Sequence, residues 1–69
     1  MKLSTRNVIK GKVLEVKEGT IMAKVKVDVG SGNILTSLIS AEAVKELNVK
    51  VGEEVQVLIK ATSVMLAKE

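Results

Sequence analysis

The chain has 69 residues, with 11 Lys and Arg against 8 Asp and Glu and a formal net charge of +3. It contains no Cys, no His and no aromatic residue, which excludes disulfides, the usual zinc sites and nucleophile–base pairs built from Cys or His. A domain of this length buries only about 60% of its unfolded surface. Because its core must be aliphatic, we expect oligomerisation to supply further burial.

Apolar runs are short throughout. None reaches the roughly 18 residues that span a bilayer, and the first residues, Met1 to Ser4, lack the apolar core of a signal peptide. These features predict a cytoplasmic protein that does not engage membranes. The charge surplus is spread along the chain in Lys residues and indicates a mild preference for anions.

The first predicted strand covers residues 7–16 and changes phase within its length. Gly11 and Val13 belong to one side of the alternation, whereas Leu14 and Val16 belong to the other. A phase change of one residue predicts a β-bulge or sharp bend near Val13. A glycine inside the run is typical of a bend or a close approach of backbones.

Two further strands are predicted before the middle of the chain. Residues 17–20 form a turn in which Gly19 is available for a positive φ. Residues 21–29 alternate strictly between apolar and polar, which predicts a half-buried antiparallel strand. Residues 30–33 have the composition of a hairpin loop. Residues 34–40 carry apolar side chains toward both faces, so we expect this strand to be buried on both sides at a subunit interface.

A short helix is predicted over residues 41–47. Ser40 is suited to cap its start and Asn48 to end it in the left-handed region. Its apolar stripe consists of Ala43, Val44 and Leu47.

Two strands are predicted after the helix. Val55, Val57 and Ile59 share one face of the first, and residues 64–67 form the second after a break at 61–63. The order of three strands, one helix and two strands predicts an all-β fold with one short helix, a five-stranded Greek-key barrel of the OB type.

Catalysis is not predicted. The Ser and Thr residues have no activating base, and none of the five glycines opens a phosphate-binding loop of the G-x4-G-K-[ST] type. OB-type barrels also bind single-stranded nucleic acid, but through aromatic platforms that this chain lacks. A basic face is conceivable from Lys10, Lys12, Lys24 and Lys26, although exposed Lys on strands commonly serves solubility and edge protection.

Hydrogen-bond donors gather in two short segments near the ends of the chain. The first contains Ser4, Arg6 and Asn7, and the second is Lys60-Ala61-Thr62-Ser63. Hydroxyls, amides and backbone N–H groups can encircle an oxyanion while one or two cations balance its charge. We expect the two segments to meet, within one subunit or between two, and to bind a small anion. The alternative is a polar chain end and an unrelated polar turn.

Almost the whole chain resembles the molbindins, the stand-alone Mop proteins whose module also occurs as the TOBE domain of molybdate-transport ATPases and molybdate-responsive regulators. The likeness lies in the S-x-R-N motif of residues 4–7 and in residues 19–25, 51–55 and 59–66. Each motif alone is weak, but their shared order and spacing make the resemblance specific.

The resemblance implies one molbindin domain over residues 1–69, an OB-type fold, and a hexamer built as a trimer of dimers. It also implies cytoplasmic storage or buffering of molybdate, with tungstate as a competitor. Molybdenum would be bound only as the oxyanion, without a coordinated metal or a cofactor. There are two alternatives. One is a regulatory module that binds a protein partner, and the other is a barrel that contacts only a nucleic-acid backbone.

The resemblance further implies two classes of anion site between subunits. The first is formed by Ser4, Arg6, Asn7, Lys60, Ala61 through its backbone N–H, Thr62 and Ser63. The second, near the symmetry axes, is expected around Lys17, Gly19, Thr20, Ser37 and Ser40. Thr5 stands where a small residue such as Ala or Gly is usual in the family.

Overall fold

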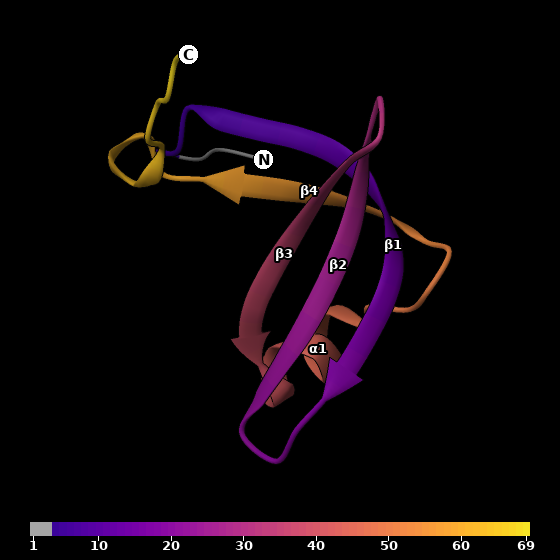
Figure 1. Cartoon of the computed structure of the whole chain (residues 1–69). Helices are drawn as coiled ribbons and strands as arrows, with labels where there is room; N and C mark the ends of the chain where they lie inside the picture. Colours follow the sequence, from indigo (N-terminus) through magenta and orange to yellow (C-terminus); the bar gives the residue numbers. More distant parts are fainter. Residues whose placement is uncertain (1–3) are drawn as a thin grey trace.

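The computed structural model of the chain describes residues 4–69, so the expectation for Met1 to Leu3 falls outside the described residues. Figure 1 shows a curved sheet with one short helix at its lower end. Within the described part, no helix is long and apolar enough to cross a membrane. The elements are β1 (Asn7–Glu18), β2 (Met22–Gly30), β3 (Asn33–Ser40), α1 (Ala41–Leu47), β4 (Glu54–Ile59) and a 3-10 helix (Ala61–Ser63).

All neighbouring strands are antiparallel, in the order β3-β2-β1-β4. The first half of β1 pairs with β4 and the second half pairs with β2, so that β1 bends between them (Figure 1). At the bend, Val13 is opposite Val27 but Glu15 is opposite Lys26, which leaves Leu14 as the extra residue of a bulge. The predicted bulge is confirmed.

Gly11 of β1 lies close to β2. A Cβ at this position would collide with the Val27 side chain and would lie 2.9 Å from the carbonyl oxygen of Asp28. The predicted close approach is therefore confirmed. Gly19 differs from expectation, because its φ is not positive. Its N–H donates to the carbonyl oxygen of Met22 at 2.8 Å, and a Cβ would lie 2.8 Å from that same oxygen.

The β2–β3 hairpin turns through two residues with positive φ, Ser31 at 54° and Gly32 at 78°, between the paired Gly30 and Asn33. This is the geometry of a type I′ turn, whose twist matches that of the flanking strands. The predicted hairpin loop is confirmed.

Helix α1 begins and ends at the residues that the sequence indicates. The Ser40 hydroxyl accepts a hydrogen bond from the Ala43 N–H at 2.9 Å, and Asn48 ends the helix with φ 55° and ψ 48°. The predicted apolar stripe is partly wrong. Val44 is buried, but Leu47 is 71% exposed and Ala41 is buried instead, because the helix meets the sheet with its first turns.

The core lies on the concave face of the sheet and is aliphatic. Alternate residues of the strands point into it, and α1 adds Val44. Its buried members are Val13, Ala23, Val25, Val27 and Val44, and Val16, Val29, Ile39, Val49, Val55 and Val57 pack against them. On β3, only this face is covered in the single chain: Ile34 and Leu38 are exposed on the other face.

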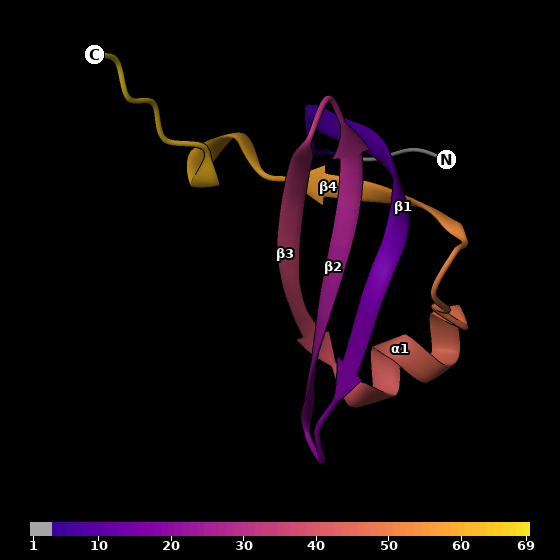
Figure 2. The same ribbon diagram turned by 45° about the vertical axis from the view of Figure 1, so that its right-hand side comes forward.

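A fifth strand over residues 64–67 was expected, but the structure has four strands in residues 4–69 and the sheet is not closed into a barrel. The tail turns away from the sheet after the 3-10 helix and extends outward (Figure 2). Its Met65 and Leu66 are 90% and 94% exposed. Since none of the strands in residues 4–69 is paired with the tail, it has no ladder partner in this part of the chain.

Candidate functional site

The two donor segments meet within one chain. Asn7, the first residue of β1, is paired with Ile59, the last residue of β4, and this pairing brings the chain ends together. The start of β1 and the end of β4 lie at the same side of the molecule in Figure 1. Between the segments is a hollow of about 200 Å³, here called the terminal hollow, which is lined by Ser4, Thr5, Arg6, Lys60, Ala61 and Thr62.

The lining of the terminal hollow combines donors with positive charge and includes no carboxylate. Arg6 and Lys60 are both exposed, and the one ion pair within residues 4–69 lies elsewhere. The N–H groups of Ala61 and Thr62 have no acceptor among residues 4–69. Hydroxyls come from Ser4 and Thr62. These groups are the donors that a tetrahedral oxyanion requires.

Two predicted ligands lie differently from expectation. The side-chain amide of Asn7 donates to the carbonyl oxygen of Ile59 at 3.1 Å, and Asn7 does not line the terminal hollow. Ser63 also lies off the lining, and its N–H donates to the carbonyl oxygen of Lys60 at 2.9 Å. Thr5 was not predicted as a site residue, yet it lines the hollow and donates to Ile59 at 2.8 Å. Its position between Ser4 and Arg6 was the available signal.

The residues of the second predicted site are brought together only in part. Ser40 is paired with Met22, and the Ala41 N–H donates to the carbonyl oxygen of Ile21 at 2.8 Å, so Ser40 lies beside the β1–β2 turn. Lys17 pairs with Lys24 on the outer face of the sheet, whereas Ser37 pairs with the buried Val25 on the inner face. Ser37 lines an apolar cavity of about 230 Å³ between β2, β3 and β4. Gly19 and Thr20 lie in the β1–β2 turn, and the hydroxyl of Ser40 caps α1. Ser37, on the inner face, is the member of this set that the single chain places apart from the others.

A larger hollow of about 470 Å³ is less suited to an anion. Its lining includes Lys10 and Lys12 but also the carboxylates of Asp28 and Glu54, both of which are opposite Lys12 in the sheet. Carboxylates repel an anion and neutralise neighbouring lysines.

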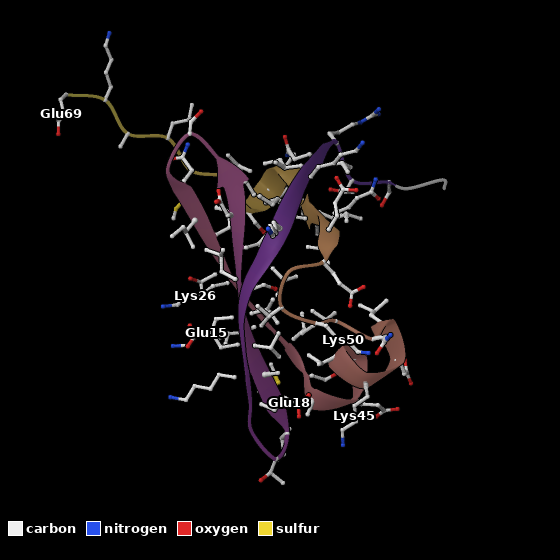
Figure 3. All side chains as sticks on the ribbon, turned by 90° about the vertical axis from the view of Figure 1, so that its right-hand side faces the viewer. Glu15, Glu18, Lys26, Lys45, Lys50 and Glu69 are labelled. Carbon is white, nitrogen blue, oxygen red and sulfur yellow. The ribbon has the colours of Figure 1, made fainter. Side chains whose placement is uncertain are left out.

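The basic face considered for nucleic acid is similarly interrupted. Lys26 forms an ion pair with Glu15 at 3.5 Å on the outer face, where Figure 3 shows the two side chains next to each other. Groups of three or more metal-binding side chains are absent from the part of the chain that the structure describes. The terminal hollow is the better candidate.

The comparisons with known proteins agree in family. Residues 3–66 match the TOBE domain. A protein of Haemophilus influenzae named as a probable molybdenum-pterin-binding protein is 52% identical over 69 residues, which are 100% of both chains. MopII of Clostridium pasteurianum superposes with a TM-score of 0.89 at 42% identity, covering 97% of this chain and 100% of its own. A molybdate-binding protein of Sporomusa ovata superposes with a TM-score of 0.92 at 37% identity, covering 99% of this chain and 100% of its own.

Proposed function

The chain belongs to the TOBE domain family, among the molybdenum-pterin-binding (Mop) proteins, and on that premise we propose that it binds molybdate without catalysing a reaction. The observation that carries the proposal is the terminal hollow, in which two cations and several hydrogen-bond donors are gathered without a carboxylate. Relatives whose names refer to molybdate or molybdenum-pterin binding support it. Storage or buffering of molybdate in the cytoplasm is the proposed role of this domain.

Each group of the terminal hollow has a part in this proposal. Arg6 and Lys60 balance the two negative charges of molybdate, and charge-assisted hydrogen bonds to an oxyanion are stronger than neutral ones. The N–H groups of Ala61 and Thr62 and the Ser4 hydroxyl donate to the remaining oxygens. Cationic and N–H donors have no lone pair that accepts a proton, so these groups favour a fully deprotonated oxyanion over hydrogen phosphate, whereas the Ser4 and Thr62 hydroxyls do not discriminate in this way. Tungstate has the same charge and shape and is expected to compete.

We also propose that the functional form is a homo-oligomer, a hexamer arranged as a trimer of dimers. Small domains of this size commonly need added burial, and this one exposes large apolar side chains on the sheet, its connecting loops and the tail. They include Ile21, Leu38, Val51, Met65 and Leu66. The second site around Lys17, Gly19, Thr20, Ser37 and Ser40 then forms where subunits meet.

We propose that the tail of one subunit completes the sheet of another. Strands β3 and β4 are the free edges of the sheet, and the apolar cavity of about 230 Å³ lies between them. A tail from another subunit, added along these edges, supplies the fifth strand and closes an OB-type barrel. This addition pairs the edge N–H and C=O groups that would otherwise be exposed and buries Val64 and Leu66.

Titration calorimetry with molybdate tests the proposal, on protein whose solution mass is measured by light scattering. Binding that persists in excess sulfate, on a protein with the mass of an oligomer, is the expected result. An absence of binding, or binding that sulfate abolishes, contradicts the assignment of the terminal hollow to molybdate.

A further inference from the structure

In the described part of the chain, the side-chain hydrogen bonds that join the two walls of the terminal hollow converge on one atom, the carbonyl oxygen of Ile59. Thr5 Oγ1 donates to it at 2.8 Å, and the side-chain amide of Asn7 donates to it at 3.1 Å. Thr5 lies just before β1 and Asn7 is its first residue, whereas the acceptor ends β4. One peptide group is therefore held by two side chains from the opposite wall.

This peptide group is adjacent to the binding residues on both walls. The carbonyl carbon of Ile59 is bonded to the nitrogen of Lys60, so holding the carbonyl orients the peptide unit that leads into Lys60. On the other wall, Arg6 lies between Thr5 and Asn7 in the sequence. The backbones at the two cations are thus fixed relative to each other, while both cationic side chains remain exposed.

Without an anion, the two cations oppose this arrangement. Arg6 and Lys60 line the same hollow, with no carboxylate on its walls, and like charges that share a site repel each other. The hydrogen bonds to Ile59 are formed by uncharged groups of the protein itself, so they persist when no anion is present. They oppose the separation of the walls in the empty protein.

Neither donor is suited to contact the anion directly. Thr5 has a single O–H, which it donates to Ile59, and its remaining lone pairs repel an oxyanion. Asn7 does not line the hollow. We propose that Thr5 and Asn7 are positioning residues that hold the Ile59 carbonyl and thereby preform the oxyanion site before the anion arrives. The proposal rests on the proposed function for the identity of the anion, but the preformed state is a property of the free protein.

The first test measures molybdate affinity in Thr5→Val, which keeps the side-chain shape but removes the O–H. A weakening of about three- to ten-fold is expected, as the loss of one neutral hydrogen bond lowers the population of the competent state. Thr5→Ser retains the donor and is expected to restore the affinity. Thr36→Val removes an exposed hydroxyl from β3 and serves as the matched control, with unchanged affinity. Unchanged affinity in Thr5→Val, or no rescue by Ser, overturns the proposal.

The second test separates positioning from direct contact. Backbone ¹⁵N relaxation of the anion-free protein is expected to show greater mobility at Arg6 and Lys60 in Thr5→Val than in the wild type, with the difference lost at saturating molybdate. Weaker affinity with unchanged mobility in the free protein identifies Thr5 as a ligand and overturns the proposal. If the wild type binds no molybdate, the proposed function fails, and unchanged mobility then overturns the positioning role as well. Asn7→Ala applies the same two tests if Thr5→Val does not fold.

Discussion

Gly11 on β1 and Val27 on β2 lie so close together that a methyl group at Gly11 would overlap the valine side chain. The contact occurs just before the bulge at Leu14, where β1 leaves β4 and continues along β2. The bend depends on this approach, because it lets one strand belong to both halves of the sheet. The terminal hollow in turn depends on the first half of β1, which pairs with β4.

Gly11→Ala is expected to destabilise the protein by about 1–3 kcal/mol, the usual cost of overpacking a tight core. Chemical denaturation of the purified protein measures this change in the free energy of unfolding. Because Val27 is the side chain in the way, Val27→Ala in the same chain is expected to recover part of the loss. Full additivity of the two substitutions argues against the steric explanation.

Arg6→Ala and Lys60→Ala are each expected to weaken molybdate binding by about 10- to 100-fold, as each removes a charge-assisted hydrogen bond. Both side chains are exposed, so thermal unfolding is expected to change little. Calorimetry and circular dichroism on the same samples measure the two effects.

Lys10→Ala is the matched control for these cations, because it removes a lysine whose surroundings include Asp28 and Glu54. We expect its affinity for molybdate to equal that of the wild type. If Lys10→Ala weakens binding as much as Lys60→Ala, the effect comes from net charge rather than from the terminal hollow.

Ser40 tests the second anion site, since its hydroxyl caps α1 and its position is also part of that proposed site. Ser40→Ala is expected to cost about 1 kcal/mol of stability through loss of the cap. Asp is also a good cap and favours a helix N-terminus electrostatically. Ser40→Asp is therefore expected to keep stability but to repel an anion nearby, which lowers the number of molybdate ions bound per subunit in calorimetry. Unchanged stoichiometry in Ser40→Asp removes Ser40 from the second site.

Features set by neighbouring residues were predictable from the sequence. The phase change between Val13 and Leu14 predicts the bulge, and Ser40 and Asn48 predict the helix ends, because each conformation is decided within a few residues. The exposed Leu47 was not predictable in the same way, since an apolar residue at helical spacing is compatible with burial against the same chain or against another.

The candidate site was also predictable only in part. Arg6 and Lys60 were expected to meet and do line one hollow, because donor clusters at both ends of the chain are visible in the sequence. The orientation of Asn7 was not predictable, since an amide donor can serve an anion or a backbone carbonyl equally well. Its choice depends on the position of Ile59, which only the pairing of β1 with β4 determines.

The predicted last strand does not form within residues 4–69, and the tail tests the proposal that its pairing partner lies in another subunit. Met65 and Leu66 are nearly fully exposed, so Leu66→Asp is expected to leave the fold of a single subunit unchanged. If the tail adds to the sheet of another subunit, the charged side chain is placed in an apolar cavity, and the oligomer is expected to dissociate. Light scattering measures the mass, and Lys68→Asp is the control for added negative charge on the tail. An unchanged oligomer in Leu66→Asp shows that the tail does not close the barrel.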